Sequence, residues 1–232
     1  MVAGYSAAQV RAAEAPHLAA GVPLMRMAAA ALAAALRREL RRVDAPEGPV
    51  LALVGAGDNG GDALYAASEL AGEGVDVTVA ATSTRMHPDA AAAARDAGAR
   101  FLTAPPSGAT AVGREFAVSA ERAALVVDGI LGTGSTSPAL RGAARELVAA
   151  LRPVLERTGA PVIAVDLPSG IHPDDGSVPD PTVLRAVRTV TFGAAKAGLL
   201  IEPGADYAGA IEVVDLGLGA ELANVTPLVE RA

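Results

Sequence analysis

Carboxylate, amide and hydroxyl side chains gather directly after three separate apolar runs in this sequence. The three polar groups are, in chain order, Asp58, Asn59 and Asp62; Asp128, Thr133 and Ser135; and Asp166 and Ser169. Each apolar run is short and continuous, as is typical of a strand buried on both faces of a parallel sheet. The carboxyl ends of such strands share one edge of an open sheet, and ligands bind at that edge. We therefore expect the three polar groups to form one site.

These oxygen-rich side chains suit two kinds of chemistry. Carboxylate, amide and hydroxyl oxygens are hard ligands, which favour alkali or alkaline-earth cations over soft metals. Two neighbouring carboxyl groups also suit proton transfer, because their mutual repulsion raises the pKa of one of them. For any single aspartate, a role as helix cap or turn former is at least as good an explanation. The convergence of three loops is what favours a functional site.

Several other classes of catalytic and metal-binding site need residues that this sequence lacks or places far apart. The sequence has no cysteine, which excludes disulfides, thiolate catalysis and cysteine-ligated zinc. Its histidines, His17, His87 and His172, are far apart, which argues against a histidine metal site. There is no G-x-S-x-G elbow, no Walker lysine and no evident Ser-His-Asp order. The chemistry that remains is acid–base work on a nucleotide-like ligand, with room for a monovalent cation.

A glycine-rich turn follows the first of the three strands. The pattern G-x-G-x-x-G starting at Gly55 fits the dinucleotide-binding fingerprint, which is weak evidence by itself. The acid that usually binds ribose about 20 residues further on is missing, since residues 80–82 are Ala, Ala and Thr. Carboxylates at the helix start, Asp58 and Asp62, also disfavour a phosphate dianion there. We expect the turn to bind hydroxyls or a cation, with phosphates nearby; the alternative is that Asp58 only caps the helix.

Strands alternate with helices along the chain. Strands are expected at 50–54, 75–81, 101–102, 124–128, 161–165, 188–192 and 211–214, and helices at 6–15, 24–41, 63–70, 89–98, 112–122 and 140–158. This order predicts an α/β fold, a Rossmann-like three-layer α/β/α sandwich with a central, mostly parallel sheet. A kink or break is expected near Pro153, and a surface loop at 104–110. The helix at 24–41 is apolar around nearly its whole circumference, so it should pack on the sheet or against a second copy of the chain.

Composition limits the class of protein. The 232 residues fit a single domain spanning 1–232, and 51% hydrophobic residues with only 3% aromatics predict a core of Ala, Val and Leu. The net charge of −7 gives no basic footprint for nucleic acid. The N-terminus lacks the early basic residues of a signal peptide, and the apolar run 27–36 is too short to span a bilayer. Neither nucleic acid nor a membrane is therefore expected as a partner, and a cytoplasmic location is the default.

Five motifs, taken in order, resemble those of one known family. GAGDNGGDAL, beginning at Gly55, resembles the GNGNNGGDG turn of the YjeF N-terminal domain, the NAD(P)H-hydrate epimerases. The motifs VVDGILGTGSTSPALRG, AVDLPSGIHPDDG, TVTFGAAKAGLL and VVDLGL follow in the family's order. LMRMAAAAL also stands where members carry an LMENAG-like helix start. The resemblance covers residues 6–218, and motifs in register are far more specific than the glycine pattern alone.

The resemblance implies an enzyme of nicotinamide-nucleotide repair. Members interconvert the R and S forms of hydrated NADH or NADPH (NADHX, NADPHX), a damaged cofactor with water at C6 of the nicotinamide ring, and a dehydratase then acts on the S form. It also implies one potassium ion per subunit, held by Asn59, Asp128 and Ser169, and a homodimer. The implied substrate-binding residues are Asp58, Asn59, Gly60, Gly61 and Asp62, the loop residues Gly132, Thr133, Gly134, Ser135, Thr136, Ser137 and Pro138, and Asp166.

For the chemistry, we hypothesise that a carboxylic acid assists departure of the C6 hydroxyl group. The lone pair of the ring nitrogen stabilises the resulting planar cation, and water returns on the opposite face. Such acid–base help is worth about 10²–10⁴-fold in rate. Asp166 is the first choice for the catalytic acid and Asp128 is the second.

The sequence departs from the family pattern at several positions. Asp58 replaces the first Asn of the family's Asn-Asn pair, and Ala63 replaces the Gly that follows the turn. Members often carry a Lys after the second strand, where Arg85 is the nearest basic residue here. These changes leave open a catalytically silent nucleotide-binding or scaffolding module of the same fold, although all three implied cation ligands are present. Lys196 matches the family's KxGL element, and a solvated lysine at a strand end is an equally good explanation for it.

Two further alternatives concern the whole protein. An ordinary NAD(P)-dependent oxidoreductase is disfavoured, because the ribose-binding acid and a Tyr-x-x-x-Lys dyad are missing. The chain could instead be one half of a bifunctional epimerase–dehydratase. The sequence leaves open this question, the preference between NADHX and NADPHX, and the role of the cation as catalytic or structural.

Overall fold

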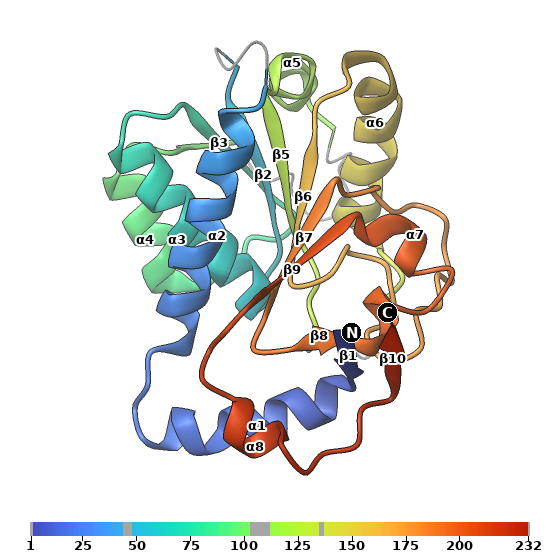
Figure 1. Ribbon diagram of the computed structural model, residues 1–232. Helices are drawn as coiled ribbons and strands as arrows, with labels where there is room; N and C mark the ends of the chain where they lie inside the picture. The colour runs from blue at the N-terminus through green and yellow to red at the C-terminus, as the bar shows by residue number, and fades with distance from the viewer. Residues whose placement is uncertain (1, 44–47, 103–111, 135–136, 232) are drawn as a thin grey trace.

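A seven-stranded sheet in which every neighbouring pair of strands runs parallel forms the centre of the molecule (Figure 1). We describe residues 2–43, 48–102, 112–134 and 137–231, as placed in a computed structural model. The strands are β2 (Val50–Val54), β3 (Val77–Ala81), β4 (Arg100–Phe101), β5 (Leu125–Gly129), β6 (Val162–Val165), β7 (Arg188–Phe192) and β9 (Ala210–Val214). Their order across the sheet is β4-β3-β2-β5-β6-β7-β9. The chain therefore winds outward in both directions from β2 and β5, and an open sheet binds ligands beside such a reversal of direction.

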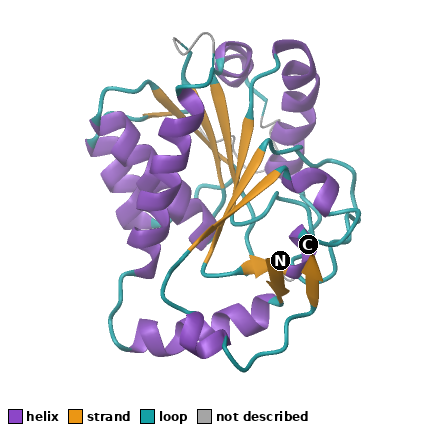
Figure 2. Ribbon diagram, in the orientation of Figure 1, coloured by secondary structure: helices purple, strands orange, loops and turns teal. Residues whose placement is uncertain are grey.

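Helices cover both faces of this sheet, which confirms the predicted three-layer sandwich (Figure 2). One layer contains α2, α3 and α4, and the other contains α5 and α6 (Figure 1). Their bounds are α2 (Leu24–Leu40), α3 (Asp58–Gly72), α4 (Pro88–Asp96), α5 (Arg114–Arg122) and α6 (Gly142–Thr158). Alternate residues of β2 enter the two cores: Val50, Ala52 and Val54 pack with the first layer, and Leu51 and Leu53 with the second. This two-residue alternation explains why β2 is apolar along its whole length.

A smaller, second sheet and two helices lie beyond the carboxyl ends of the central strands (Figure 1). The small sheet has the order β10-β1-β8, with β1 antiparallel to β10 and parallel to β8. The elements of this region are β1 (Val2–Tyr5), α1 (Ala7–Ala19), β8 (Ala195–Lys196), the 3₁₀ turn η1 (Ala197–Leu199), α8 (Gly219–Leu222) and β10 (Val229–Arg231), whereas the short helix α7 (Ala205–Ala208) directly precedes β9. The short strands escaped the sequence analysis because two to four residues carry no periodic signal.

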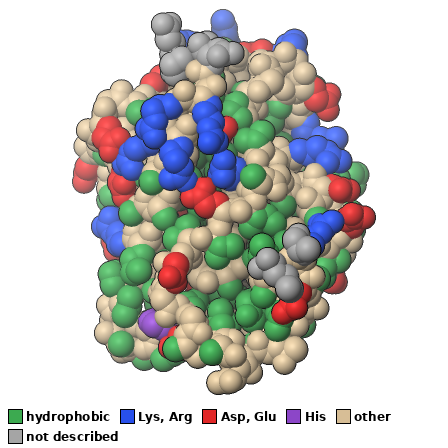
Figure 3. Space-filling model, in the orientation of Figure 1, with side chains coloured by type: hydrophobic (Ala, Val, Ile, Leu, Met, Phe, Trp, Pro, Cys, Tyr) green, Lys and Arg blue, Asp and Glu red, His purple; other side chains and the backbone are tan. Residues whose placement is uncertain are grey.

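Ion pairs fasten the outer surface of α2 to its neighbours. Figure 3 shows a gathering of basic side chains, which are arginines because the only lysine is buried, with acidic ones on one face of the molecule. Arg37 pairs with Glu69 at 3.0 Å and with Glu73 at 2.6 Å, and Arg38 pairs with Glu212 of β9. Because these groups are largely exposed, each pair contributes no more than about 1 kcal/mol.

The length and apolar character of the helices are relevant to the expectation that the chain has no membrane partner. Within the described ranges, no single helix has the length and apolar character needed to cross a bilayer. Only α1 and α2 taken together reach both, and the two are bent by 115° relative to each other.

Two helix boundaries differ by more than two residues from the sequence expectation, and one expected break is not found. Helix α1 begins after Ser6 as expected, since the Ser6 hydroxyl oxygen accepts a hydrogen bond from the Gln9 N–H at 3.1 Å, but it continues to Ala19. Helix α6 continues through Pro153, so the helix is not interrupted there. Helix α3 starts at Asp58 rather than at residue 63, because the glycine turn itself forms the first helical turn. The loop expected at 104–110 lies outside the described residues.

Candidate functional site

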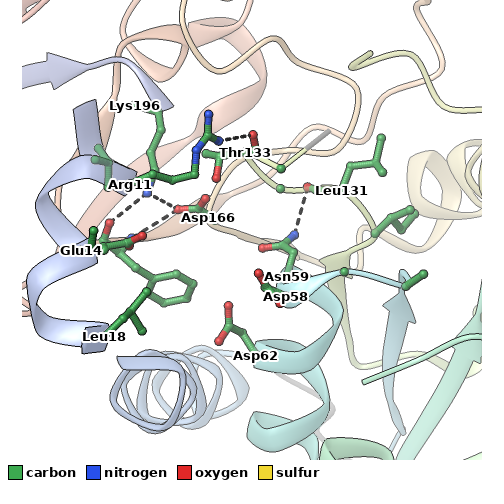
Figure 4. Close-up of a pocket in the computed structure, with 18 residues that line it drawn as sticks. Arg11, Glu14, Leu18, Asp58, Asn59, Asp62, Leu131, Thr133, Asp166 and Lys196 are labelled. Atoms are coloured by element: carbon green, nitrogen blue, oxygen red, sulfur yellow. Dashed lines mark hydrogen bonds and ion pairs between the residues drawn. The ribbon is translucent and has the colours of Figure 1, made fainter. Parts of the chain in front are cut away.

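A cavity of about 710 Å³ opens at the carboxyl edge of the central sheet, between that edge and helix α1 (Figure 4). Its size is within the range of pockets that hold small molecules and cofactors. Four parts of the chain supply the walls, which are α1, the turn after β2, the loop after β5, and side chains that follow β6, β7 and β8. The convergence of loops predicted from the sequence is thus present, and α1 closes the side opposite the sheet.

The glycine turn after β2 is held by very close backbone packing. A Cβ atom on Gly55 would lie 1.8 Å from the carbonyl oxygen of Ile130, and one on Gly60 would lie 2.2 Å from the carbonyl oxygen of Gly55. Only glycine permits these approaches, which bring the turn against the loop after β5. Gly57 is the N-cap of α3 and Asp58 is its first helical residue. The alternative that Asp58 caps the helix is therefore wrong.

Three side chains predicted to bind potassium cluster behind the cavity. The Ser169 N–H donates to Asp128 Oδ2 at 2.9 Å, and the Ser169 hydroxyl donates to Asp128 Oδ1 at 2.6 Å. The Leu131 N–H donates to the Ser169 hydroxyl oxygen at 2.9 Å, and Asn59 Nδ2 donates to the Leu131 carbonyl oxygen at 3.0 Å. The backbone of Leu131 therefore links Asn59 to the Asp128–Ser169 pair. Burial raises the pKa of Asp128, and hydrogen bonds from Ser169 and Ile130 act in the opposite direction.

The chemistry of this cluster fits a monovalent cation. The side-chain oxygen of Asn59, Oδ1, is buried and has no hydrogen-bond partner among the described residues. The groups linked to Asn59 by hydrogen bonds include a hydroxyl, a main-chain carbonyl and a carboxylate, which are hard ligands. Within the described ranges no three His, Cys, Asp or Glu side chains come together as a metal site. An oxygen set with one carboxylate suits a singly charged ion better than a transition metal.

A buried ion pair lies in the wall of the cavity. Lys196 is only 2% exposed, and its Nζ pairs with Asp166 Oδ1 and donates to the Phe192 carbonyl oxygen at 2.9 Å. Thr191 Oγ1 also donates to Asp166 Oδ1, at 3.1 Å. Asp166 has a left-handed backbone with φ of 65°, which costs energy in a non-glycine residue. The alternative that Lys196 is a solvated strand-end lysine is wrong, because its charge is paired inside the protein.

Two more carboxyl groups face the same cavity. Burial, together with the negative charges of Asp166 and Asp58, raises the pKa of Asp62 to about 8. Burial likewise raises the pKa of Glu14, a residue of α1. Arg11, one turn before Glu14, donates from Nη1 to the Thr133 carbonyl oxygen at 2.9 Å and so ties α1 to the loop after β5. Sequence reasoning missed Glu14 and Arg11, because no local pattern shows that α1 folds back over the sheet edge.

The predicted site residues occupy different depths. Those that line the cavity are Asp58, Asn59, Asp62, Gly132, Thr133, Gly134 and Asp166. Gly60 and Gly61 are buried in the first turn of α3. Asp128 and Ser169 are buried and are not among the lining residues. Ser137 lines a second cavity of about 380 Å³ that shares Ala56, Ile130 and Leu131 with the first, Pro138 is partly buried nearby, and Ser135 and Thr136 lie outside the described residues.

The fold and the site together define a Rossmann-like α/β domain. Its acid-rich pocket lies at the carboxyl edge of the sheet, where the strand order reverses direction between β2 and β5. Residues 21–198 match the family described as YjeF-related protein N-terminus. This chain belongs to that family, which confirms the resemblance found in its motifs.

Relatives and a solved structure agree with this placement. The chain is 55% identical to the NAD(P)H-hydrate epimerase of Clavibacter sepedonicus, over 99% of this chain and 96% of that protein. It is 47% identical to the NAD(P)H-hydrate epimerase of Microbacterium testaceum, over 100% of this chain and 85% of that protein. It is also 40% identical to the bifunctional NAD(P)H-hydrate repair enzyme Nnr of Mycobacterium tuberculosis, over 92% of this chain and 41% of that protein. The crystal structure of the yeast protein ynu0 matches with a TM-score of 0.75 at 18% identity, covering 100% of this chain and 97% of that one, which supports the fold.

Proposed function

We propose that this protein is an NAD(P)H-hydrate epimerase, an isomerase that interconverts the R and S forms of NADHX and NADPHX. The observation that carries the proposal is the cavity, in which the buried Asp166–Lys196 pair and the carboxyl group of Asp62 face one space at the sheet edge. Full-length similarity to proteins of that name gives independent support. The expectation of an epimerase is thereby confirmed at the level of the family and its named members.

The two adjoining cavities suit the two halves of a dinucleotide. The larger one holds the carboxyl groups that the reaction needs, so we assign the hydrated nicotinamide ring to it. The smaller one lies beside Thr82, at the end of β3, and near the start of α6, which suits the remainder of the nucleotide. The turn 58–62, the loop 132–138 and Asp166 would then hold the substrate, as the family resemblance implies.

The cavity offers acid–base groups for the hydrated ring. Departure of the C6 hydroxyl group needs a proton, and return of water on the other face releases one. Asp166 lines the cavity, so we retain it as a catalytic residue that transfers a proton at that position. Asp128 was the second choice, but it does not line the cavity and is already bonded to Ser169. We propose that Asp128 binds the cation instead.

Potassium is the ion that the buried cluster fits best. We propose that Asn59, Asp128 and Ser169 hold it, with the Leu131 carbonyl group between them. When bound, the ion would supply a fixed positive charge beside the negatively charged nucleotide. That charge would offset the repulsion from Asp58, the acidic departure from the family's turn.

The family departures do not disturb this arrangement. Ala63 is buried and packs beside Gly129 of β5, where a Cβ atom on the glycine would come within 2.6 Å of the Ala63 methyl group. The extra methyl group therefore fits because its neighbour is glycine, and it lies outside the set of cavity-lining residues. The Ala63 departure therefore gives no support to the catalytically silent module.

The remaining partner expectations follow from the proposed reaction. The Mycobacterium relative is a bifunctional repair enzyme and is far longer than this chain. We propose that a dehydratase specific for the S form consumes the product, either as a separate protein or as a fused domain. The homodimer and the cytoplasmic location stay predictions.

A coupled assay tests the proposed function. R and S NADHX are mixed with an S-specific dehydratase in potassium buffer, with and without this protein. We expect the protein to accelerate consumption of the R form. Consumption of the R form at its spontaneous rate, with a folded protein present, contradicts the proposal and favours the silent module.

A further inference from the structure

Asp62 is a buried acid of the cavity that makes no side-chain hydrogen bond or ion pair with the described residues. The residue is 8% exposed, and its Oδ1 atom is buried without a hydrogen-bond partner among the described residues. It lies in the first turns of α3, directly beneath the cavity (Figure 4). A carboxyl group that is buried, unpartnered and directed into a ligand site is available for a ligand atom.

The two cationic residues that line the cavity are engaged elsewhere. Lys196 pairs with Asp166, and Arg11 donates to the main chain of Thr133. The groups that face Asp62 from the surrounding elements are Asp58 on its own helix, Glu14 on α1, and the Asp166–Lys196 pair beyond β6 and β8. Three of these four groups are acids, and the one base is already neutralised.

This environment keeps the Asp62 carboxyl group protonated at neutral pH. Burial disfavours the charged form, and the charges of Asp166 and Asp58 act in the same direction, so the pKa is raised to about 8. Asp166 is instead paired with the Lys196 ammonium group and accepts a hydrogen bond from the Thr191 hydroxyl group. Asp62 and Asp166 therefore present two carboxyl groups in unlike environments, one buried without a partner and one ion-paired, and unlike environments are what separate an acid from a base in acid–base catalysis.

Resting on the proposed epimerase function, we propose that Asp62 is the catalytic acid that protonates the departing C6 hydroxyl group, and that the carboxylate of Asp166 accepts the proton of the returning water. The proposal assigns to Asp62 a role beyond binding of the nucleotide. It also gives the Asp166–Lys196 pair a purpose, since the lysine keeps its partner ready to accept a proton.

The step balances in atoms and charge. The C6–O bond breaks, its electron pair goes to oxygen, and the Asp62 proton converts the hydroxyl group to water, while the ring-nitrogen lone pair forms a C=N double bond. A water molecule then attacks C6 on the opposite face, the C=N electrons return to nitrogen, and the proton of the new C6–OH₂⁺ group goes to Asp166. Exchange with solvent restores the Asp62 proton and the Asp166 carboxylate. The reverse reaction uses the same two groups in exchanged roles.

Glu14 is the competing candidate, and its surroundings disfavour it. The positive charge of Lys196 favours the ionised form of both groups, but it is second only to burial for Glu14, whereas for Asp62 it ranks behind the opposing charges of Asp166 and Asp58. Glu14 also lies on α1, a helix outside the central sheet that contacts the loop after β5 through Arg11. Asp62 instead belongs to α3, which packs directly on the central sheet beside the cation cluster.

The test compares Asp62→Asn and Asp62→Glu with wild type and with Asp89→Asn, a control at an exposed aspartate in the first turn of α4. We expect the epimerisation rate to fall about 10²–10⁴-fold in Asp62→Asn. We also expect an affinity for NADPH within a few-fold of wild type in that variant. Asp62→Glu should recover part of the rate, and Asp89→Asn should match wild type. The wild-type rate should decline above about pH 8, and Asp62→Asn should lack this alkaline decline.

Two outcomes overturn the assignment. One is an Asp62→Asn rate within tenfold of wild type, and the other is an unchanged alkaline decline in that variant. A carboxyl titration by ¹³C NMR gives a readout that needs no activity: we expect one aspartate to stay protonated to near pH 8, and its signal to vanish in Asp62→Asn. Absence of any such signal overturns the assignment as well. A wild type that does not epimerise while showing this titration would refute the proposed function itself, so the two failures can be told apart.

Discussion

Replacing Asp62 by Asn is expected to stabilise the protein at neutral pH while removing its activity. The pKa of Asp62 is raised from its ordinary value of 3.8 to about 8 in the folded state. Between these two values the folded state binds more protons than the unfolded state, so this group makes the free energy of unfolding fall as pH rises. Ionisation of Asp62 has no effect on the free energy of unfolding below about pH 4, and above about pH 8 it lowers that free energy by its full amount. Asn removes the titration and keeps a similar shape.

The magnitude follows from the size of the pKa shift. One pKa unit corresponds to about 1.4 kcal/mol, so a group titrated from its unfolded value to pH 7 costs at most about 4 kcal/mol, and above pH 8 at most about 6 kcal/mol. Domains of this kind are stable by about 5–15 kcal/mol in total, so the effect is a large fraction. A stability cost of this size at a functional position is the usual exchange between stability and activity.

Urea unfolding at pH 5, 6, 7 and 8 measures this effect in wild type, Asp62→Asn and the exposed control Asp89→Asn. Other carboxyl groups titrate in all three proteins, so the difference between variant and wild type isolates Asp62. We expect the Asp62→Asn variant to gain stability over wild type progressively from pH 5 to pH 8, and the control to show a difference that does not vary with pH. A flat difference for Asp62→Asn would refute the argument that Asp62 is buried in its protonated form.

Three further predictions concern the other parts of the site. Asp166→Asn should lower the epimerisation rate about 10²–10⁴-fold with little change in NADPH affinity, and a variant with the wild-type rate would remove Asp166 from the mechanism. Lys196→Met should lower the free energy of unfolding, measured in urea at pH 7, by about 3–5 kcal/mol, because it leaves the buried Asp166 charge unpaired. The double variant Lys196→Met with Asp166→Asn should recover much of this loss, and a single variant as stable as wild type would contradict the buried pair. Asn59→Ala should raise the potassium concentration needed for half-maximal activity at least several-fold, because it removes the buried oxygen that has no partner; an unchanged potassium dependence would move the cation elsewhere.

The sheet could be predicted from the sequence because its strands are buried on both faces. Val50–Val54 is apolar at every position, since alternate residues enter two different cores. The loops after β2, β5 and β6 were placed together by the parallel order of the strands alone. The boundary of α3 was not predictable in this way. Two glycines oppose a helix in isolation, and the close packing of Gly60 against the Gly55 backbone is a contact that no local pattern reveals.

The acid–base roles needed the structure. A sequence places Asp62 and Asp166 at the same edge, but it does not reveal that Lys196 neutralises one of them and leaves the other unpaired. Lys196 is 30 residues from Asp166 along the chain, and its burial comes from the tight turn after β7. Glu14 and Arg11 were also invisible, because α1 reaches the cavity only through the tertiary fold. Roles that depend on burial and on distant partners are the part of a site that local patterns do not encode.

Incorporation of ¹⁸O tests the central claim most directly, namely that this cavity removes and returns the C6 hydroxyl group. Pure R NADHX is incubated with the protein in H₂¹⁸O, and mass spectrometry follows the label at C6 as the S form appears. We predict that ¹⁸O enters the S form as it is made, and that Asp62→Asn slows epimerisation and labelling together. Complete epimerisation that leaves the original oxygen in place would contradict the account.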